Sequence, residues 1–203
     1  MTQNIEAVIF DLGRVLIHID LEPMQKMLIS SGASNDGEET AGKVRESGLI
    51  PQLNSGKISF EQFYQSVCSR YGFDWPLDLF RRAWCSIFYP NPEMEALVHE
   101  LNGRIPLGLL SDTDLTHWTY IRQNYPIVGV FKKPTLSFQV GVCKPDPKIY
   151  QIAAQSVGMP AQRCLFIDDL PGNVEGARQA GMSAVQFQNA DQVRQELKRC
   201  GIL

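Results

Sequence analysis

Five side chains that could bind a metal ion and a phosphoryl group stand after short apolar runs or before a proline. They are Asp11, Ser111, Lys144, Asp168 and Asp169. Carboxylates are the kind of oxygen ligand that Mg²⁺ prefers, and a carboxylate can also attack phosphorus as a nucleophile. A hydroxyl and a lysine can bind and neutralise the oxygens of a phosphoryl group. Together these residue types predict phosphoryl transfer assisted by a divalent cation.

The apolar runs that precede these groups have the length and composition of strands buried on both faces. The expected strands cover residues 7–10, 107–110, 164–167 and 184–187, and amphipathic helical segments alternate with them after residue 90. This alternation predicts an α/β fold with a doubly wound parallel sheet. Ligands of such sheets bind beyond the carboxyl ends of the strands, so the five side chains should meet at one edge.

Between residues 21 and 90 the pattern is helical, and no convincing strand is expected there. Ser59 and Gln62 fit a capping box that opens a helix with one apolar face. Ten of the nineteen aromatic residues lie between residues 60 and 89, so this block should have a small core of its own. We therefore predict an inserted α-helical cap over residues 18–90 and an α/β core formed by residues 1–17 and 91–203.

Composition narrows the classes of partner. The chain has 203 residues, of which 44% are hydrophobic and 20% charged, as in an ordinary globular protein. Its net charge of −3 argues against nucleic acid or an anionic membrane as a partner, and no apolar run approaches the length of a membrane span. The five cysteines show no zinc spacing, and the first residues lack the pattern of a secretion signal. We expect a cytoplasmic monomer or homodimer that binds a small molecule.

Four ordered segments resemble the motifs of the haloacid dehalogenase (HAD) superfamily, and the intervening block resembles its C1 helical cap. The segments are Phe10–Leu16, Leu110–Asp114, Lys144–Pro145 and Ile167–Asn173. The resemblance implies a Rossmann-like HAD core with an inserted cap. The first two segments are most similar to the sugar-phosphatase branch that includes alpha-D-glucose-1-phosphate phosphatase. In that branch the second motif usually has asparagine at the positions of Asp112 and Asp114, so the chain departs from the branch there.

The resemblance implies a set of roles around a Mg²⁺ ion. Asp11 would be the nucleophile, attacking phosphorus to give an aspartyl-phosphate that water then hydrolyses. The Asp11 carboxylate, the Gly13 carbonyl and Asp169 would bind Mg²⁺. Asp168 would orient these ligands or hold metal-bound waters, as would Asn173.

The resemblance also implies a phosphate-binding set. Ser111 and the backbone N–H of Asp112 would bind phosphoryl oxygens. Lys144 would neutralise charge on the nucleophile and on the transferred group. The predicted function is therefore a Mg²⁺-dependent phosphatase acting on a small phosphorylated metabolite, with a sugar phosphate as the favoured substrate.

Gly13 stands where most phosphatases of the superfamily have a second aspartate, which protonates the leaving oxygen. Either His18 or Asp20 at the cap junction substitutes for it, or the substrate has a leaving group that departs without full protonation. We favour the second interpretation, which predicts a preference for aryl phosphates and sugar 1-phosphates.

Two other functions remain open within the same superfamily. In a metal-free 2-haloacid dehalogenase Asp11 would attack carbon, although that branch usually has an aromatic residue in place of Gly13 and lacks the acidic pair. A catalytically weak relative would keep the pocket for binding alone, and the glycine at position 13 keeps that alternative open.

Overall fold

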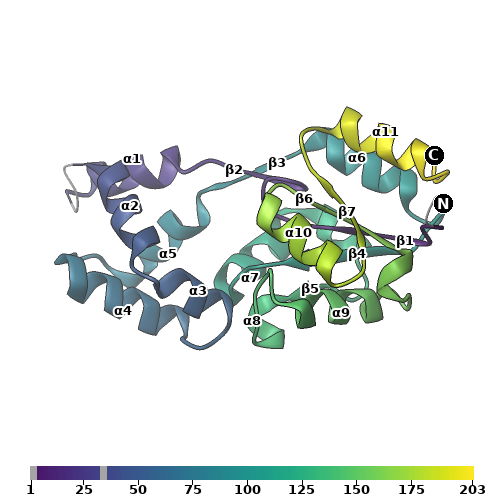
Figure 1. Cartoon of the computed structure of the whole chain (residues 1–203). Coiled ribbons are helices and arrows are strands. Elements are labelled where there is room, and N and C mark those ends of the chain that lie inside the picture. The colour runs from purple at the N-terminus through teal and green to yellow at the C-terminus, as the bar shows by residue number, and fades with distance from the viewer. Residues whose placement is uncertain (1–3, 33–35) are drawn as a thin grey trace.

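A five-stranded parallel sheet forms the centre of the larger of two bodies (Figure 1). The computed structural model describes residues 4–32 and 36–203. The strand order is β5-β4-β1-β6-β7, and every neighbouring pair is parallel. The strands are β1 Ala7–Phe10, β4 Leu107–Ser111, β5 Thr135–Leu136, β6 Cys164–Asp168 and β7 Ser183–Gln186. The predicted doubly wound α/β fold is confirmed.

The central strand β1 is apolar throughout because both of its faces are covered. Val8 and Phe10 pack into one hydrophobic cluster, whereas Ala7 and Ile9 pack into another on the opposite face of the sheet. All four side chains are completely buried. Alternation of side chains along a strand thus explains the unbroken apolar run.

Helices cover both faces of the sheet. Helices α6 Pro92–Leu101, α7 Leu115–Asn124 and α11 Ala190–Arg199 pack into the cluster that contains Val8. Helices α9 Pro147–Ser156 and α10 Pro171–Gln179 pack into the cluster that contains Ile9. The remaining short helices of this body are η1 Pro126–Val130, α8 Ser137–Val140 and η2 Ala161–Arg163. The sequence did not predict α7 or the two-residue strand β5.

In the described part of the chain, the second body contains five helices inserted between β1 and α6. They are α1 Glu22–Ser30, α2 Gly37–Glu46, α3 Leu49–Asn54, α4 Phe60–Tyr71 and α5 Leu77–Cys85. The predicted capping box is present at the start of α4, where the Ser59 hydroxyl accepts from the Gln62 N–H and the Gln62 side chain accepts from the Ser59 N–H.

Aromatic rings fill the centre of this cap. Phe63 lies between Phe80 and Trp84, with ring centroids 5.9 and 4.9 Å away. The cap thus has its own hydrophobic cluster, as the sequence predicted. Among the described residues, no helix in either body is both long and apolar enough to span a lipid bilayer.

The expectation of no strand between residues 21 and 90 is wrong at the carboxyl end of that segment. Strand β2 Ile17–Ile19 pairs antiparallel with β3 Phe88–Pro90, and the two form a ribbon where the chain enters and leaves the cap. Each strand has only three residues, too few for a periodic pattern. Their pairing joins segments about 70 residues apart, so the sequence gives no local indication of it.

Candidate active site

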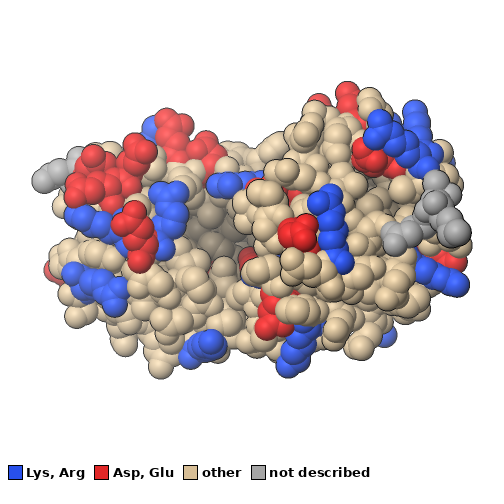
Figure 2. All heavy atoms as spheres, viewed as in Figure 1, with Lys and Arg blue, Asp and Glu red and all other residues tan. Residues whose placement is uncertain are grey.

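The carboxyl ends of β1, β4 and β6 bring the predicted polar side chains to one edge of the sheet. Asp11 follows β1, Ser111 ends β4 and Asp168 ends β6. Lys144 reaches them from the loop before α9. A cavity of about 460 Å³ opens between this edge and the cap, and the molecular surface is visibly hollowed there (Figure 2).

Lys144 joins two of the carboxylates. Its Nζ donates to Asp11 Oδ1 and to Asp168 Oδ2, both at 2.6 Å, and its side chain is almost completely buried. Burial by itself would lower the pKa of Lys144, but the charges of Asp11, Asp168 and Asp112 raise it above its usual range. The lysine therefore stays charged beside the proposed nucleophile.

Asp11 has an unusual electrostatic environment. Burial raises its pKa to about 7, Lys144 opposes that rise and the negative charge of Asp168 adds to it. Lys144 Nζ donates to Oδ1 of this carboxylate, and the backbone N–H of Leu12 also hydrogen-bonds to it.

Asp168 serves as an organising residue, because its oxygens are already engaged. Besides Lys144, it accepts from the Leu170 N–H at 2.8 Å and from Asn173 Nδ2 at 3.0 and 3.1 Å. The neighbouring Asp169 lines the cavity and is more exposed. Its nearest cation is Arg14, whose Nη1 lies 3.8 Å from the carboxylate.

The donor set fits a hard divalent cation. Asp11, Asp168 and Asp169 each offer a carboxylate oxygen, and these oxygens lie within 4.8 Å of one another. Burial and the charge of Asp168 both raise the pKa of Asp169, so the negative charges crowd one another despite Lys144. A cation bound by oxygen ligands would relieve this repulsion, and Mg²⁺ takes such ligands.

Ser111 and Asp112 lie beside this cluster. The Ser111 hydroxyl lines the cavity and makes no hydrogen bond with any other residue that the structure describes. Asp112 uses its carboxylate differently, because Oδ1 accepts from the backbone N–H of Lys144 at 3.0 Å. Burial is the main cause that raises the pKa of Asp112. The Asp112 side chain therefore holds the lysine loop.

The two candidates for a substitute acid lie away from the cavity. His18 and Asp20 are exposed, and neither belongs to the cavity wall. The Asp20 carboxylate accepts from the Glu22 N–H at 2.9 Å, at the start of α1. At position 13, a Cβ atom built on the glycine would lie 2.8 Å from Cδ1 of Ile19. The end of the Ile19 side chain would therefore have to shift to make room for a side chain at position 13.

A family model for haloacid dehalogenase-like hydrolases matches residues 5–181. The chain belongs to this family. The match covers all four motif segments and the cap, so the predicted family membership is confirmed.

Relatives of this HAD-like hydrolase include a phosphatase of the same length. D-ribitol-5-phosphate phosphatase from Bacteroides thetaiotaomicron is 25% identical over 201 residues, which cover 95% of this chain and 97% of the relative. A magnesium complex of the HAD family enzyme bt-2542 from the same organism superimposes with a TM-score of 0.82 at 25% identity, covering 97% of this chain and 99% of the other.

Haloacid dehalogenases share the fold. The 2-haloacid dehalogenase from Pseudomonas syringae pv. Tomato superimposes with a TM-score of 0.68 at 19% identity, covering 96% of this chain and 99% of the other. At this level of identity the likeness concerns the architecture alone.

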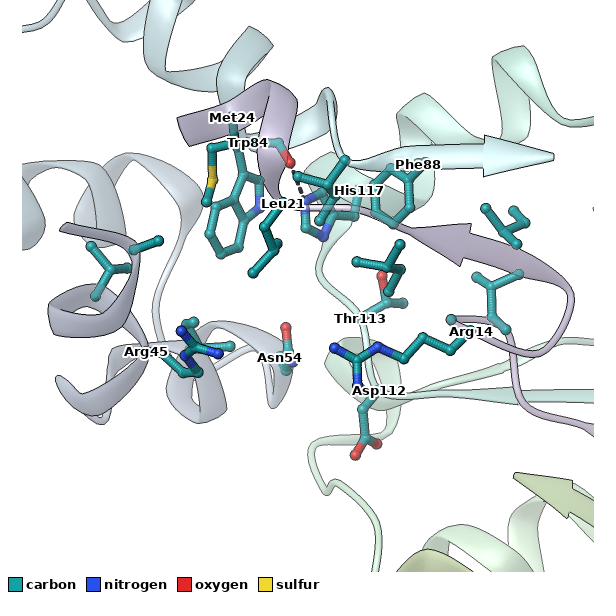
Figure 3. A pocket seen from close by; sticks show the side chains of 18 of the residues that line it. Arg14, Leu21, Met24, Arg45, Asn54, Trp84, Phe88, Asp112, Thr113 and His117 are labelled. Atoms are coloured by element: carbon teal, nitrogen blue, oxygen red, sulfur yellow. Dashed lines mark hydrogen bonds between the residues drawn. The ribbon is translucent and has the colours of Figure 1, made fainter. Parts of the chain in front are cut away.

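The HAD-like hydrolase also has cavity residues that sequence reasoning missed. Arg14 directly follows Gly13, has a φ of 62° and extends its guanidinium into the cavity between core and cap (Figure 3). A positive φ is uncommon for a residue with a side chain, and a local pattern in the sequence does not reveal it.

His117 was likewise missed as a contact between the two bodies. Its ring stacks on Trp84 of α5, and its Nδ1 lies 3.1 Å from Asp114 Oδ2. Trp84 Nε1 donates to the same Asp114 oxygen at 3.1 Å. These contacts join the cap to α7, a helix that the sequence did not predict.

Proposed function

We propose that this chain is a Mg²⁺-dependent phosphatase that hydrolyses a small phosphorylated metabolite through an aspartyl-phosphate on Asp11. The observation that carries the proposal is the cluster of three carboxylates within 4.8 Å, joined by a buried lysine at the carboxyl edge of the sheet. Family membership and a phosphatase relative that covers 95% of the chain support phosphoric monoester hydrolase as the enzyme class.

Residues of the chain would divide the chemistry among themselves. The carboxylate of Asp11 would attack phosphorus while Lys144 holds its Oδ1 atom in place. Ser111 and the backbone N–H of Asp112 would bind phosphoryl oxygens, and Lys144 would neutralise the charge that develops there. A water molecule would then hydrolyse the aspartyl-phosphate and restore the Asp11 carboxylate.

The metal would be bound by Asp11, the Gly13 carbonyl and Asp169. Asp168 and Asn173 would orient these ligands, in agreement with the hydrogen bonds that already engage Asp168. When bound, Mg²⁺ would supply positive charge to the phosphoryl oxygens. A magnesium complex of the similar enzyme bt-2542 supports this choice of ion.

A phosphorylated polyol is the substrate class that the D-ribitol-5-phosphate phosphatase relative supports, in line with the sugar phosphate predicted from the sequence. The apolar side chains on the cap side of the cavity favour a different organic group.

All five cysteines are free thiols, which agrees with our proposal that the protein acts in the cytoplasm.

The proposal is tested by a phosphate-release screen over sugar phosphates, polyol phosphates, nucleotides and aryl phosphates, with Mg²⁺ and with excess EDTA. We expect phosphate release that EDTA abolishes and that Mg²⁺ restores. Chloride release from 2-chloropropionate in EDTA would instead support the dehalogenase alternative. Binding of phosphate esters without any turnover would support the alternative of a catalytically weak relative that only binds its ligand.

A further inference from the structure

The cap side of the cavity is built mainly from apolar side chains. They come from the segment before α1, from α1 and α2, from the loop before α5 and from α5, and include Leu21, Met24, Val44, Phe73, Trp75 and Trp84. Figure 3 shows Leu21, Met24 and Trp84 facing the cavity opposite Arg14 and Asp112. Since the phosphoryl group must lie at the carboxylate cluster, this apolar wall faces the organic part of the substrate.

Few polar groups interrupt that wall. Among the described cap residues that line the cavity, the polar side chains are Thr40, Arg45 and Asn54. Trp75 adds one buried indole N–H that has no hydrogen-bond partner in the structure. A polyol carries a hydroxyl on nearly every carbon, and each hydroxyl buried without a partner costs free energy. The wall offers few partners for such a group and suits an apolar one.

The core side of the cavity restricts the leaving group independently. Gly13 cannot transfer a proton, and neither His18 nor Asp20 lines the cavity. An alkyl alkoxide leaves poorly without a proton, whereas an aryloxide is stabilised by its ring. An aryl group therefore meets both requirements, since it is apolar and departs as a stable anion.

We propose that the substrates of this enzyme are aryl phosphates whose ring system packs against the cap wall; the proposal rests on the phosphatase function proposed above. In the first step Asp11 forms a bond to phosphorus while the bond from phosphorus to the aryl oxygen breaks. The electron pair goes to the aryl oxygen, which takes a proton from water. Water then cleaves the aspartyl-phosphate, so that one ester and one water give one phenol and one inorganic phosphate.

The first test compares 2-naphthyl phosphate, phenyl phosphate, glucose 1-phosphate and ribitol 5-phosphate in the presence of Mg²⁺. The two aryl groups leave with similar ease, so their comparison isolates contact with the wall. We expect kcat/KM for the naphthyl ester to exceed that for the phenyl ester by about tenfold, and both to exceed the values for glucose 1-phosphate and ribitol 5-phosphate.

The second test changes the wall. Met24→Gln keeps the length of the side chain but adds an amide, and should lower kcat/KM for 2-naphthyl phosphate by about tenfold. Acetyl phosphate, which has no ring, should be unaffected. Ile29→Gln is the matched control because Ile29 lies on the same helix and is 51% exposed. If Met24→Gln fails to fold, Val44→Thr makes the same comparison with a side chain of nearly unchanged volume.

The outcomes separate the two proposals. Higher kcat/KM for ribitol 5-phosphate or glucose 1-phosphate than for 2-naphthyl phosphate would overturn the aryl substrate and leave the phosphatase intact. No phosphate release from any ester would overturn the phosphatase. If no ester is hydrolysed, naphthyl fluorescence still measures binding. Weaker binding of 2-naphthyl phosphate by Met24→Gln, but not by Ile29→Gln, would support contact between the ring and the apolar wall. Equal binding by the two variants would reject that contact.

Discussion

The imidazole of His117 lies flat against the indole of Trp84, with ring centroids 4.7 Å apart and planes inclined by 8°. Trp84 belongs to the cap and His117 to the core, so this stack is a joint between the two bodies. His117 Nε2 also hydrogen-bonds to the backbone carbonyl of Trp84 at 2.8 Å. The carboxylate of Asp114 completes the joint by contacting both rings.

We predict that His117→Phe destabilises the protein by about 1–3 kcal/mol. The ring stack can persist, but both contacts of the imidazole nitrogens are lost at a buried position. The Asp114 carboxylate and the Trp84 carbonyl each lose one partner. Urea unfolding measures the effect. His99→Phe is the control, because the His99 side chain is 56% exposed on α6, and it should change stability by no more than about 0.5 kcal/mol. Equal effects of the two substitutions would show that the contacts of His117 with Trp84 and Asp114 do not stabilise the protein.

A second prediction concerns the nucleophile. Asp11→Asn preserves the shape of the side chain but removes the attacking charge, so turnover should fall by several orders of magnitude. Asp78→Asn makes the same chemical change at an exposed carboxylate on α5 and is the matched control. It should retain most of the activity. Single-turnover phosphate release measures both, and more than a few per cent activity in Asp11→Asn would reject the assignment.

The nature of the signals explains how much the sequence could predict. Val8 and Ile9 indicate a strand covered on both faces, because each residue of such a strand is buried and is therefore apolar. The carboxyl ends of parallel strands share one edge, so the polar residues after the strands could be predicted to meet there, and Asp11 and Ser111 line the same cavity. The contact geometry and the electrostatic details of Asp11 depend on side chains more than a hundred residues away, such as Lys144.

Other features depend on pairing between distant segments. The ribbon between Ile17 and Pro90 is too short to show a period, and it depends on pairing between distant segments and on the burial of Ile17 in the core. The cap wall is also beyond sequence reasoning, because an apolar residue on a helix has the same local pattern whether it faces a cap core or a cavity. Met24, for instance, packs against two hydrophobic clusters and also lines the cavity.

A third prediction links metal binding to pH. In the metal-free protein the pKa of Asp11 is raised to about 7, chiefly by burial. Protons and Mg²⁺ therefore compete for this carboxylate, and lowering the pH below about 7 should weaken apparent Mg²⁺ binding by up to about tenfold per unit. Calorimetric titrations with Mg²⁺ from pH 5.5 to 8 measure this dependence. Affinity that does not change over this range would show that Asp11 is not a ligand.

A fourth prediction concerns Asp169. Asp169→Ala should abolish Mg²⁺-dependent phosphate release and weaken Mg²⁺ binding, while leaving the fold intact because this carboxylate lies at the cavity surface. Glu175→Ala is a control, since Glu175 is an exposed carboxylate on α10 that pairs only weakly with Arg178. Normal Mg²⁺ dependence in Asp169→Ala would remove this residue from the metal site.

The last prediction restores the missing acid. An aspartate at position 13 would place its Cβ 2.8 Å from Ile19 Cδ1, so the end of the Ile19 side chain must shift in Gly13→Asp. Ile19→Val removes that terminal methyl group, and the double variant should fold and gain activity. A positioned acid typically contributes about 10²–10⁴ in rate. We expect the gain for alkyl phosphates, whose leaving groups need a proton, and little gain for aryl phosphates.

Ile19→Val alone is the control for the enlarged space, and it should change neither class of substrate by more than a few-fold. Plotting log kcat/KM against leaving-group pKa should give a steep negative slope for the natural sequence and a shallower slope for the double variant. The slope becomes shallower because the introduced carboxyl group protonates the departing oxygen, so less negative charge develops on that oxygen. A shallow slope in the natural sequence would show that another group already protonates the leaving oxygen. If His18→Gln or Asp20→Asn then steepened that slope, the group would be identified.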